Sequence, residues 1–317
     1  MVREAGGRYR APAMSARELV VLGTSSQVPT RTRNHNGYLL LWDGEGLLFD
    51  PGEGTQRQLS LAGISASQIT RICITHLHGD HCFGLPGVLQ RLEMDRVTHA
   101  VDLWYPASGT VYIERLRGAV IGRAEVALRA KPAEEGLLAD TGGFRLLARR
   151  LDHRVDTLGY RLEEPAGVRM LPDRLAARGV QGPDITRLQE TGAIEVDGGT
   201  VRLGEVSVPR RGQVFAFVMD TRLCDTAFEL AADADMLVAE ATFLAEHADL
   251  AASYGHLTAA QAATIARDAG ARLLVLTHFS QRYDDAGARA RAEAETVFDG
   301  EIVAAEDLMR VPLPSRH

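Results

Sequence analysis

The chain of 317 residues is 45% hydrophobic and 24% charged, the composition of an ordinary globular protein of one or two domains. Its net charge of −7 argues against an indiscriminate coat for nucleic acid but leaves room for a local basic site. No apolar run reaches the roughly 18 residues of a membrane span, and three cysteines are few enough to suit the reducing cytoplasm.

The predicted elements alternate between strands and helices. Residues 1–17, rich in Gly, Pro and Arg, are expected to be a disordered leader before one domain over 18–317. Short apolar runs bounded by turn residues predict strands at 19–22, 38–42, 47–49, 72–74, 144–148, 214–219, 236–238 and 273–276. Helical periodicity predicts helices at 55–62, 86–92, 112–120, 226–232 and 258–269. This alternation predicts a layered α/β protein.

The stretch from about 163 to 212 interrupts the alternation. It combines glycines, prolines and many arginines with weak periodicity. It is too long for an ordinary connection within a compact domain. We therefore expect either a functional protrusion or a disordered insert.

The clearest chemical signal is the sequence THLHGDH at 75–81, directly after a predicted strand. Side chains two residues apart in an extended segment point the same way, so His76 and His78 can reach one metal ion together. Beyond the turn, Asp80 and His81 point toward a second ion. Imidazole and carboxylate donors without thiolates suit zinc, with manganese as a substitute. The alternative, a few surface histidines after a strand, leaves this spacing unexplained.

Two ions need more ligands than these four, and the carboxyl ends of later predicted strands supply candidates. His153, Asp220 and His278 each follow an apolar strand. The consistent arrangement places His76, His78 and His153 on one ion and Asp80, His81 and His278 on the other, with Asp220 bridging them. Two such ions can clamp a displacement at phosphorus.

Further polar residues are candidates for positions beside the ions. Asp50 follows another strand and is expected either to orient a ligand histidine or to be a plain turn residue. His256, just before a predicted helix start, is the candidate proton donor, unless it only decorates that start. Glu240, at a strand end, could set the charge on His256. Asp80 could hold a proton of the attacking water as well as a metal.

With these positions in place, the sequence resembles the metallo-β-lactamase superfamily and, within it, the ribonuclease Z family of tRNA 3′-processing endonucleases. The likeness runs from about Leu19 to Pro312. Besides the histidine motif, it rests on segments in the family's order: LGTS at 22–25, PTRTRN at 29–34, FDPGEGTQ at 49–56, GLPG at 84–87, DTR at 220–222, EATF at 240–243, HLT at 256–258 and THFSQRY at 277–283.

The resemblance implies a four-layer αβ/βα sandwich with a protruding arm at about 163–212. It implies a homodimer with two Zn²⁺ per subunit that removes 3′ trailers from precursor tRNA and leaves a 3′-hydroxyl on the tRNA. The arm would grip the tRNA body. Arg31 and Arg33 of the opening loop would contact the tRNA end, although solvation is the usual fate of exposed arginines. Arg282, four residues from His278, is expected to face the same cleft.

Two other functions stay open. A hydrolase of a small phosphodiester, sulfate ester or lactone would share the metal motif but leave the arm without a role. A metal-stabilised RNA-binding protein without turnover would tolerate departures from the family pattern. Three occur, at Met219, Ala239 and Leu257, where the family usually has Gly, His and Ser.

Overall fold

The computed structural model describes residues 17–119, 127–283 and 285–316. The expected leader 1–17 therefore lies outside the described residues except for Arg17, as does Val120 at the end of one predicted helix. Contacts divide the chain into a large unit and a smaller one, and the smaller consists mainly of residues 163–213.

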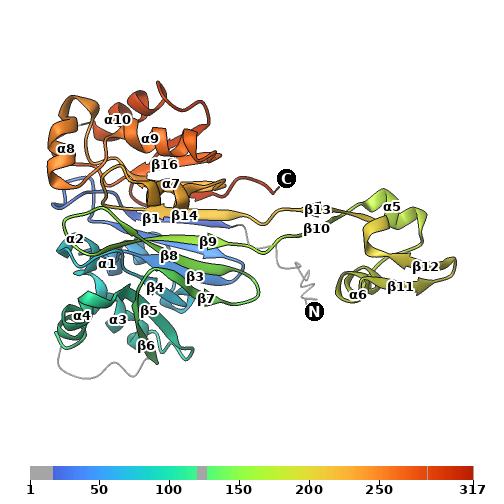
Figure 1. Cartoon of the computed structure of the whole chain (residues 1–317). Helices are drawn as coiled ribbons and strands as arrows, with labels where there is room; N and C mark the ends of the chain where they lie inside the picture. The colour runs from blue at the N-terminus through green and yellow to red at the C-terminus, as the bar shows by residue number, and fades with distance from the viewer. Residues whose placement is uncertain (1–16, 120–126, 284, 317) are drawn as a thin grey trace, which may run out of the picture. The chain divides into compact units, whose positions relative to one another are not determined.

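Two sheets form the centre of the large unit, with seven strands each among the described residues (Figure 1). The first has the order β18-β1-β2-β3-β4-β5-β6. Its strands are β1 (Glu18–Gly23), β2 (Gly37–Trp42), β3 (Glu45–Phe49), β4 (Arg71–Cys73), β5 (Val101–Pro106), β6 (Leu128–Ala133) and β18 (Arg310–Pro312). From β3 to β6 the neighbouring strands are parallel, so their carboxyl ends meet at one edge.

The second sheet has the order β17-β16-β15-β14-β9-β8-β7. Its strands are β7 (Gly136–Asp140), β8 (Arg145–Leu151), β9 (Thr157–Glu163), β14 (Val214–Val218), β15 (Met236–Glu240), β16 (Leu273–Thr277) and β17 (Glu301–Ala304). The run from β14 to β17 is parallel. It therefore presents a second set of carboxyl strand ends.

Helices cover the outer faces of both sheets (Figure 1). The first sheet is covered by α1 (Thr55–Leu61), α3 (Leu85–Met94) and α4 (Thr110–Arg117), and the second by α7 (Asp225–Ala231), α9 (Ala259–Asp268) and α10 (Ala286–Ala294). The short α2 (Gly79–Cys82) and α8 (Ala248–Tyr254) lie in connections, as do 3₁₀ turns at Ala66–Gln68, Ala107–Gly109 and Ala245–His247. The predicted four-layer αβ/βα sandwich is confirmed.

Aromatic side chains fill the space between the sheets. Tyr38 and Phe49 are paired across β2 and β3, so they point to the same face. Phe49 stacks on Phe217 of the second sheet with ring centroids 4.7 Å apart, and Tyr38 meets the same ring edge-on at 5.3 Å. Burial of these large rings holds the two sheets face to face.

The smaller unit is folded around a core of its own. β10 (Gly167–Met170) pairs with β13 (Ser207–Arg210), and β11 (Ala193–Val196) with β12 (Gly199–Arg202), both antiparallel. With α5 (Pro172–Ala177), α6 (Pro183–Thr191) and the turn Leu203–Glu205 they bury six apolar side chains: Leu175, Val180, Leu188, Ile194, Val201 and Val206. The expectation of a disordered insert at about 163–212 is therefore wrong.

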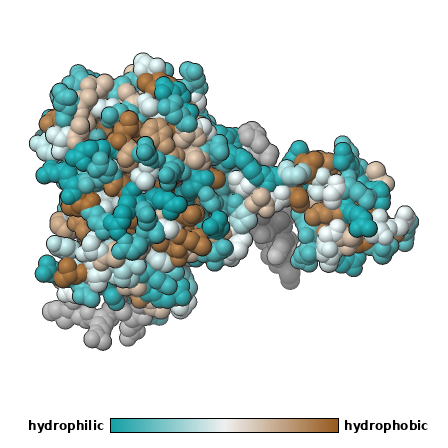
Figure 2. All heavy atoms as spheres, in the orientation of Figure 1, coloured by the Kyte–Doolittle hydropathy of each residue, from teal (hydrophilic) through white to brown (hydrophobic). Residues whose placement is uncertain are grey.

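Hydrophilic and hydrophobic residues both contribute to the surface. Figure 2 shows hydrophilic residues over most of the face in view, with hydrophobic ones scattered among them. Within the described ranges, no helix combines the length and apolar character needed to span a bilayer.

Candidate metal centre

The backbone turns sharply where three strands end at the site. Asp50 directly follows β3, Asp220 lies two residues beyond β14, and His278 directly follows β16. Their φ angles are 44°, 45° and 60°, in the left-handed region that residues with a Cβ rarely adopt. Such backbone outliers gather where the surrounding structure fixes a side chain for a purpose. Here they bring side chains from both sheets to one edge.

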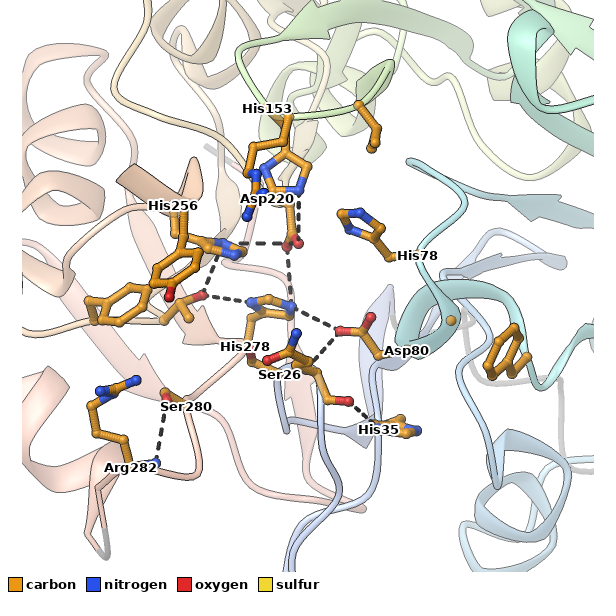
Figure 3. A pocket seen from close by; sticks show the side chains of 18 of the residues that line it. Ser26, His35, His78, Asp80, His153, Asp220, His256, His278, Ser280 and Arg282 are labelled. Atoms are coloured by element: carbon orange, nitrogen blue, oxygen red, sulfur yellow. Dashed lines mark hydrogen bonds and ion pairs between the residues drawn. The ribbon is translucent and has the colours of Figure 1, made fainter. Parts of the chain in front are cut away.

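A first group of possible metal ligands consists of His76, His78, His153 and Asp220. One donor atom from each lies within 4.8 Å of the others. Nε2 of His76 is 2.8 Å from Nδ1 of His78 and 3.5 Å from Oδ2 of Asp220. Nε2 of His153 is 3.8 Å from the same carboxylate oxygen (Figure 3).

A second group consists of Asp80, His81 and His278. Nε2 of His81 lies 3.3 Å from Oδ2 of Asp80 and 3.4 Å from Oδ2 of Asp220. Nε2 of His278 lies 3.6 Å from Asp80 and 3.2 Å from Oδ1 of Asp220. The seven residues predicted as ligands thus converge in two groups, with Asp220 adjoining both.

Outer contacts aim the ring nitrogens into the site. Nδ1 of His81 donates to Asp50 at 2.8 Å, and the backbone amide and hydroxyl of Thr75 fix that carboxylate, each at 2.7 Å. Nδ1 of His153 donates to the Gly255 carbonyl at 2.7 Å, while Nδ1 of His278 lies 2.7 Å from the Thr242 hydroxyl oxygen. Each contact leaves Nε2 free to bind a metal, the arrangement typical of ligand histidines.

Three buried polar atoms of these two groups have no hydrogen bond within the described part of the chain. They are Nε2 of His153, Nε2 of His278 and Oδ1 of Asp220. Buried polar atoms normally have a partner, so atoms of this kind that converge on one point indicate a bound cation. Burial also lowers the pKa of His76, His78 and His153, which keeps the imidazoles in the neutral form that metals bind.

The two carboxyl groups among the ligands favour the anionic form. Burial opposes ionisation of Asp80 and Asp220, yet the adjacent imidazoles of His81 and His278 hold the pKa of both carboxyls below their usual range. Burial likewise opposes charging of His81, but Asp80, Asp220 and Asp50 raise its pKa well above the ordinary value. These carboxylates demand positive charge, which divalent cations supply in place of protons. The residues therefore fit a divalent metal site.

His256 and Glu240 form a buried pair beside the two groups. Nδ1 of His256 lies 3.1 Å from each carboxylate oxygen of Glu240 and 4.0 Å from Asp220. Burial lowers the pKa of His256, but the charges of Glu240 and Asp220 outweigh it and raise that pKa to about 9. Glu240 is fully buried and also accepts from the Thr221 amide at 2.8 Å. The structure thus places Glu240 beside His256, the residue whose charge it was expected to set.

An open cleft of about 710 Å³ lies over these groups. Of the predicted substrate-binding arginines, only Arg282 lines it. Arg33 instead donates to Thr24 at 2.8 Å and to the Ala305 carbonyl at 3.3 Å, so its guanidinium is used within the fold. Arg31 is exposed in the opening loop and does not line the cleft.

Several residues on the cleft wall were not predicted from the sequence, among them Phe83, Arg154, Tyr254 and Gln27. Phe83 and Arg154 lie within two residues of predicted ligands, and that proximity could have revealed them. Tyr254, on α8, lies two residues before His256, the predicted proton donor, which is the same kind of signal. Gln27, whose backbone amide donates to Oδ2 of Asp80 at 2.8 Å, gives no such signal.

The three departures from the family pattern lie behind the site. Met219, Ala239 and Leu257 are fully buried, and none of them lines the cleft. Ala239 and Leu257 belong to the apolar core shared by the second sheet and its helices. Their substitutions therefore leave the group of converging ligands intact.

Comparison with known proteins agrees with this geometry. Residues 30–171 match the model of the metallo-beta-lactamase superfamily, the class of hydrolase that the fold and the His/Asp cluster define. The ribonuclease Z of Nocardia farcinica is 62% identical over 308 residues, covering 96% of this chain and all of the relative. The ribonuclease Z of Streptomyces avermitilis is 58% identical with the same coverage.

A solved structure points the same way. The crystal structure of the short form of human tRNase Z has a TM-score of 0.68 and 28% identity, covering 94% of this chain and all of that one. The chain belongs to the ribonuclease Z family. The predicted family and enzyme class, a metal-dependent endoribonuclease, are confirmed.

Replacing the carboxylate behind His81 should weaken metal binding. We expect Asp50→Asn to lower zinc affinity on the order of 10- to 100-fold, because the imidazole loses the charged acceptor that orients it. Competition with a chromophoric chelator measures the affinity. Asp95→Asn, which removes a surface ion pair with Arg91, is the matched control. Equal affinity in Asp50→Asn and wild type would contradict the orienting role.

Proposed function

We propose that this chain cuts precursor tRNA after the discriminator nucleotide, leaving a 3′-hydroxyl on the tRNA and a 5′-phosphate on the trailer. The observation that carries the proposal is the convergence of seven His and Asp side chains, four of them buried, with Asp220 between two groups. Extensive identity to proteins named ribonuclease Z supports the choice of substrate. We further propose two Zn²⁺ per subunit, Mn²⁺ as a substitute, and action as a cytoplasmic homodimer.

A phosphodiester is anionic and repels nucleophiles, so hydrolysis needs charge neutralisation and an acidified water. Bound divalent ions supply both. In the proposed arrangement His76, His78 and His153 would hold one ion and Asp80, His81 and His278 the other, with the carboxylate of Asp220 available to either. The described contacts of Asp50, Thr242 and Gly255 keep the ligand rings in place.

Two side chains are proposed to move the protons. The oxygen of water forms a bond to phosphorus, and the carboxylate of Asp80, fixed by the Gln27 amide, takes up the water's proton. The bond from phosphorus to the ribose O3′ breaks, and its electron pair stays on O3′. His256 then donates a proton to that oxygen. Glu240 favours the protonated form of His256, which the raised pKa keeps present at neutral pH.

Substrate contacts are proposed for Arg282 in the cleft and for Arg31 in the opening loop. The smaller unit offers further positive charge. Arg174, Arg178 and Arg187 bond to groups within that unit. Arg169 and Arg202 are exposed, with no ion pair in the described part of the chain, so they remain available to RNA phosphates.

Cleavage of a labelled precursor tRNA with a 3′ trailer, in the presence of zinc, tests the proposed function. We expect a single cut beside the discriminator nucleotide, abolished by a chelator. His76→Ala and Asp220→Ala should lose the activity and also retain less zinc. Hydrolysis of bis-p-nitrophenyl phosphate without any cut in the tRNA would mean that the substrate is a small phosphodiester. Full activity in either variant would overturn the ligand assignment.

The role of His256 can be separated from metal binding by the choice of leaving group. We expect His256→Ala to lower the rate of tRNA cleavage by about 10²- to 10⁴-fold, because O3′ leaves poorly without a proton. Hydrolysis of bis-p-nitrophenyl phosphate should change little, since p-nitrophenolate leaves without one. The control is the zinc content, which should equal that of the wild type. An equal loss on both substrates would contradict the proton-donor role.

The smaller unit can be shortened without disturbing the pairing of β10 with β13. Because Met170 and Ser207 are directly paired, replacing residues 171–206 by Asn-Gly closes β10 and β13 as a two-residue hairpin. We expect this variant to hydrolyse bis-p-nitrophenyl phosphate normally but to lose cleavage of precursor tRNA. The rates of both reactions, followed by gel or mass analysis of their products, measure the difference between the two activities. Loss of both activities together would assign this unit to fold stability instead.

A further inference from the structure

The cleft has two aromatic walls. They differ in whether positively charged side chains lie beside them and in their position relative to the proposed proton donor. The first wall is formed by Phe243 and Tyr254, with near-parallel rings whose centroids are 6.4 Å apart. The Phe243 ring lies 6.0 Å from the ring of His256. Tyr254 is 46% exposed and therefore presents much of its surface to an incoming group.

Each ring of this wall has a guanidinium over it. Cζ of Arg154 lies 5.7 Å from the Tyr254 ring centroid, and Cζ of Arg282 lies 5.5 Å from that of Phe243. Both arginines line the cleft, and neither forms an ion pair with a described carboxylate. An unpaired nucleotide is bound by this combination, because its base stacks on an aromatic face and its phosphate pairs with a nearby positive charge.

The second wall is Phe83, which ends α2 and is 59% exposed. Its ring lies against Gly79, where a Cβ would come within 2.5 Å of it. Phe83 is therefore tied to the turn that carries Asp80. No guanidinium covers its ring among the described residues, so it offers an aromatic face without a phosphate contact.

Figure 3 shows His256 and Asp80 on opposite sides of Asp220 and His278. Because the products are a tRNA 3′-hydroxyl and a trailer 5′-phosphate, the oxygen that His256 protonates belongs to the discriminator nucleotide. The ribose of that nucleotide must therefore lie on the His256 side. The strand continues past the scissile phosphate through O5′, toward the side of Asp80.

We propose that the cleft binds the RNA strand in one direction, with the discriminator base on Tyr254 and the first trailer base on Phe83. This proposal rests on the proposed function and adds the positions of the two nucleotides that flank the cut. Stacking on an aromatic ring tolerates every base, so both subsites accept any nucleotide. The direction of the strand, rather than base identity, fixes which bond is cut.

Four combinations of variant and substrate test the direction. We expect Tyr254→Ala to lower kcat/KM on an intact precursor by about 10- to 100-fold but to have no further effect when the discriminator nucleotide is abasic. Phe83→Ala should show the same relation with an abasic first trailer nucleotide. Tyr254→Ala should still lower kcat/KM by the full amount when the first trailer nucleotide is abasic. Phe83→Ala should do so when the discriminator nucleotide is abasic. Tyr254→Phe, which keeps the ring, should restore wild-type cleavage.

Tyr112→Ala is the matched control, since Tyr112 is 52% exposed on α4, lies under Arg115 at 5.6 Å, and does not line the cleft. It should cleave every substrate as the wild type does. The proposal is overturned if Tyr254→Ala loses its effect on the substrate with the abasic trailer nucleotide and Phe83→Ala on the one with the abasic discriminator nucleotide. It is also overturned if each variant lowers kcat/KM equally on intact and abasic precursors while its zinc content stays normal. Failure of the proposed function is distinct, because wild-type protein would then leave the intact precursor uncut.

Discussion

The site depends on a concentration of buried negative charge. Asp50, Asp80 and Asp220 lie close together among histidines, and the described residues bring no lysine or arginine to them. Isolated buried carboxylates are strongly disfavoured, so this arrangement is stable only when cations balance it. The ring orientations serve that requirement, because the contacts of Asp50, Thr242 and the Gly255 carbonyl each aim a histidine nitrogen into the site.

The two-sheet architecture meets this requirement by assembling the ligands from segments far apart in sequence. Parallel strands in each sheet end at one edge, and the aromatic contacts between the sheets keep the two edges together. The motif at 75–81 supplies four of the proposed ligands, whereas His153, Asp220 and His278 each come from a different strand of the second sheet. The proposed ligands therefore come together as a set only in the folded chain.

Sequence alone predicted the strands and ligands whose signals are local. An apolar run followed by a histidine or aspartate indicates a buried strand whose end carries a functional side chain. All seven proposed ligands either follow such a run or lie in the motif at 75–81. β9 was missed because Gly159 and Arg161 interrupt its apolar pattern. Gly159 is needed there, since a Cβ would lie 2.4 Å from the Leu230 side chain.

Features set by distant partners could not be read in this way. The four-residue strands β10 to β13 are too short and too exposed for a periodic signal. Arg33 looked like a free basic residue, yet its partners Thr24 and Ala305 are fixed only by the folded loop. The contact from Gln27 to Asp80 uses a backbone amide, which any residue except proline would supply.

The left-handed backbone at Asp220 and His278 has a consequence for how such chains change over time. Each such residue raises the free energy of the folded state by about 1–3 kcal/mol, an amount that glycine would largely remove. Selection for stability and selection for hydrolysis therefore oppose each other at these two positions. A descendant released from its RNA substrate would gain stability by the same substitutions that erase its metal ligands, so lineages that lose the activity should lose the centre quickly and seldom regain it.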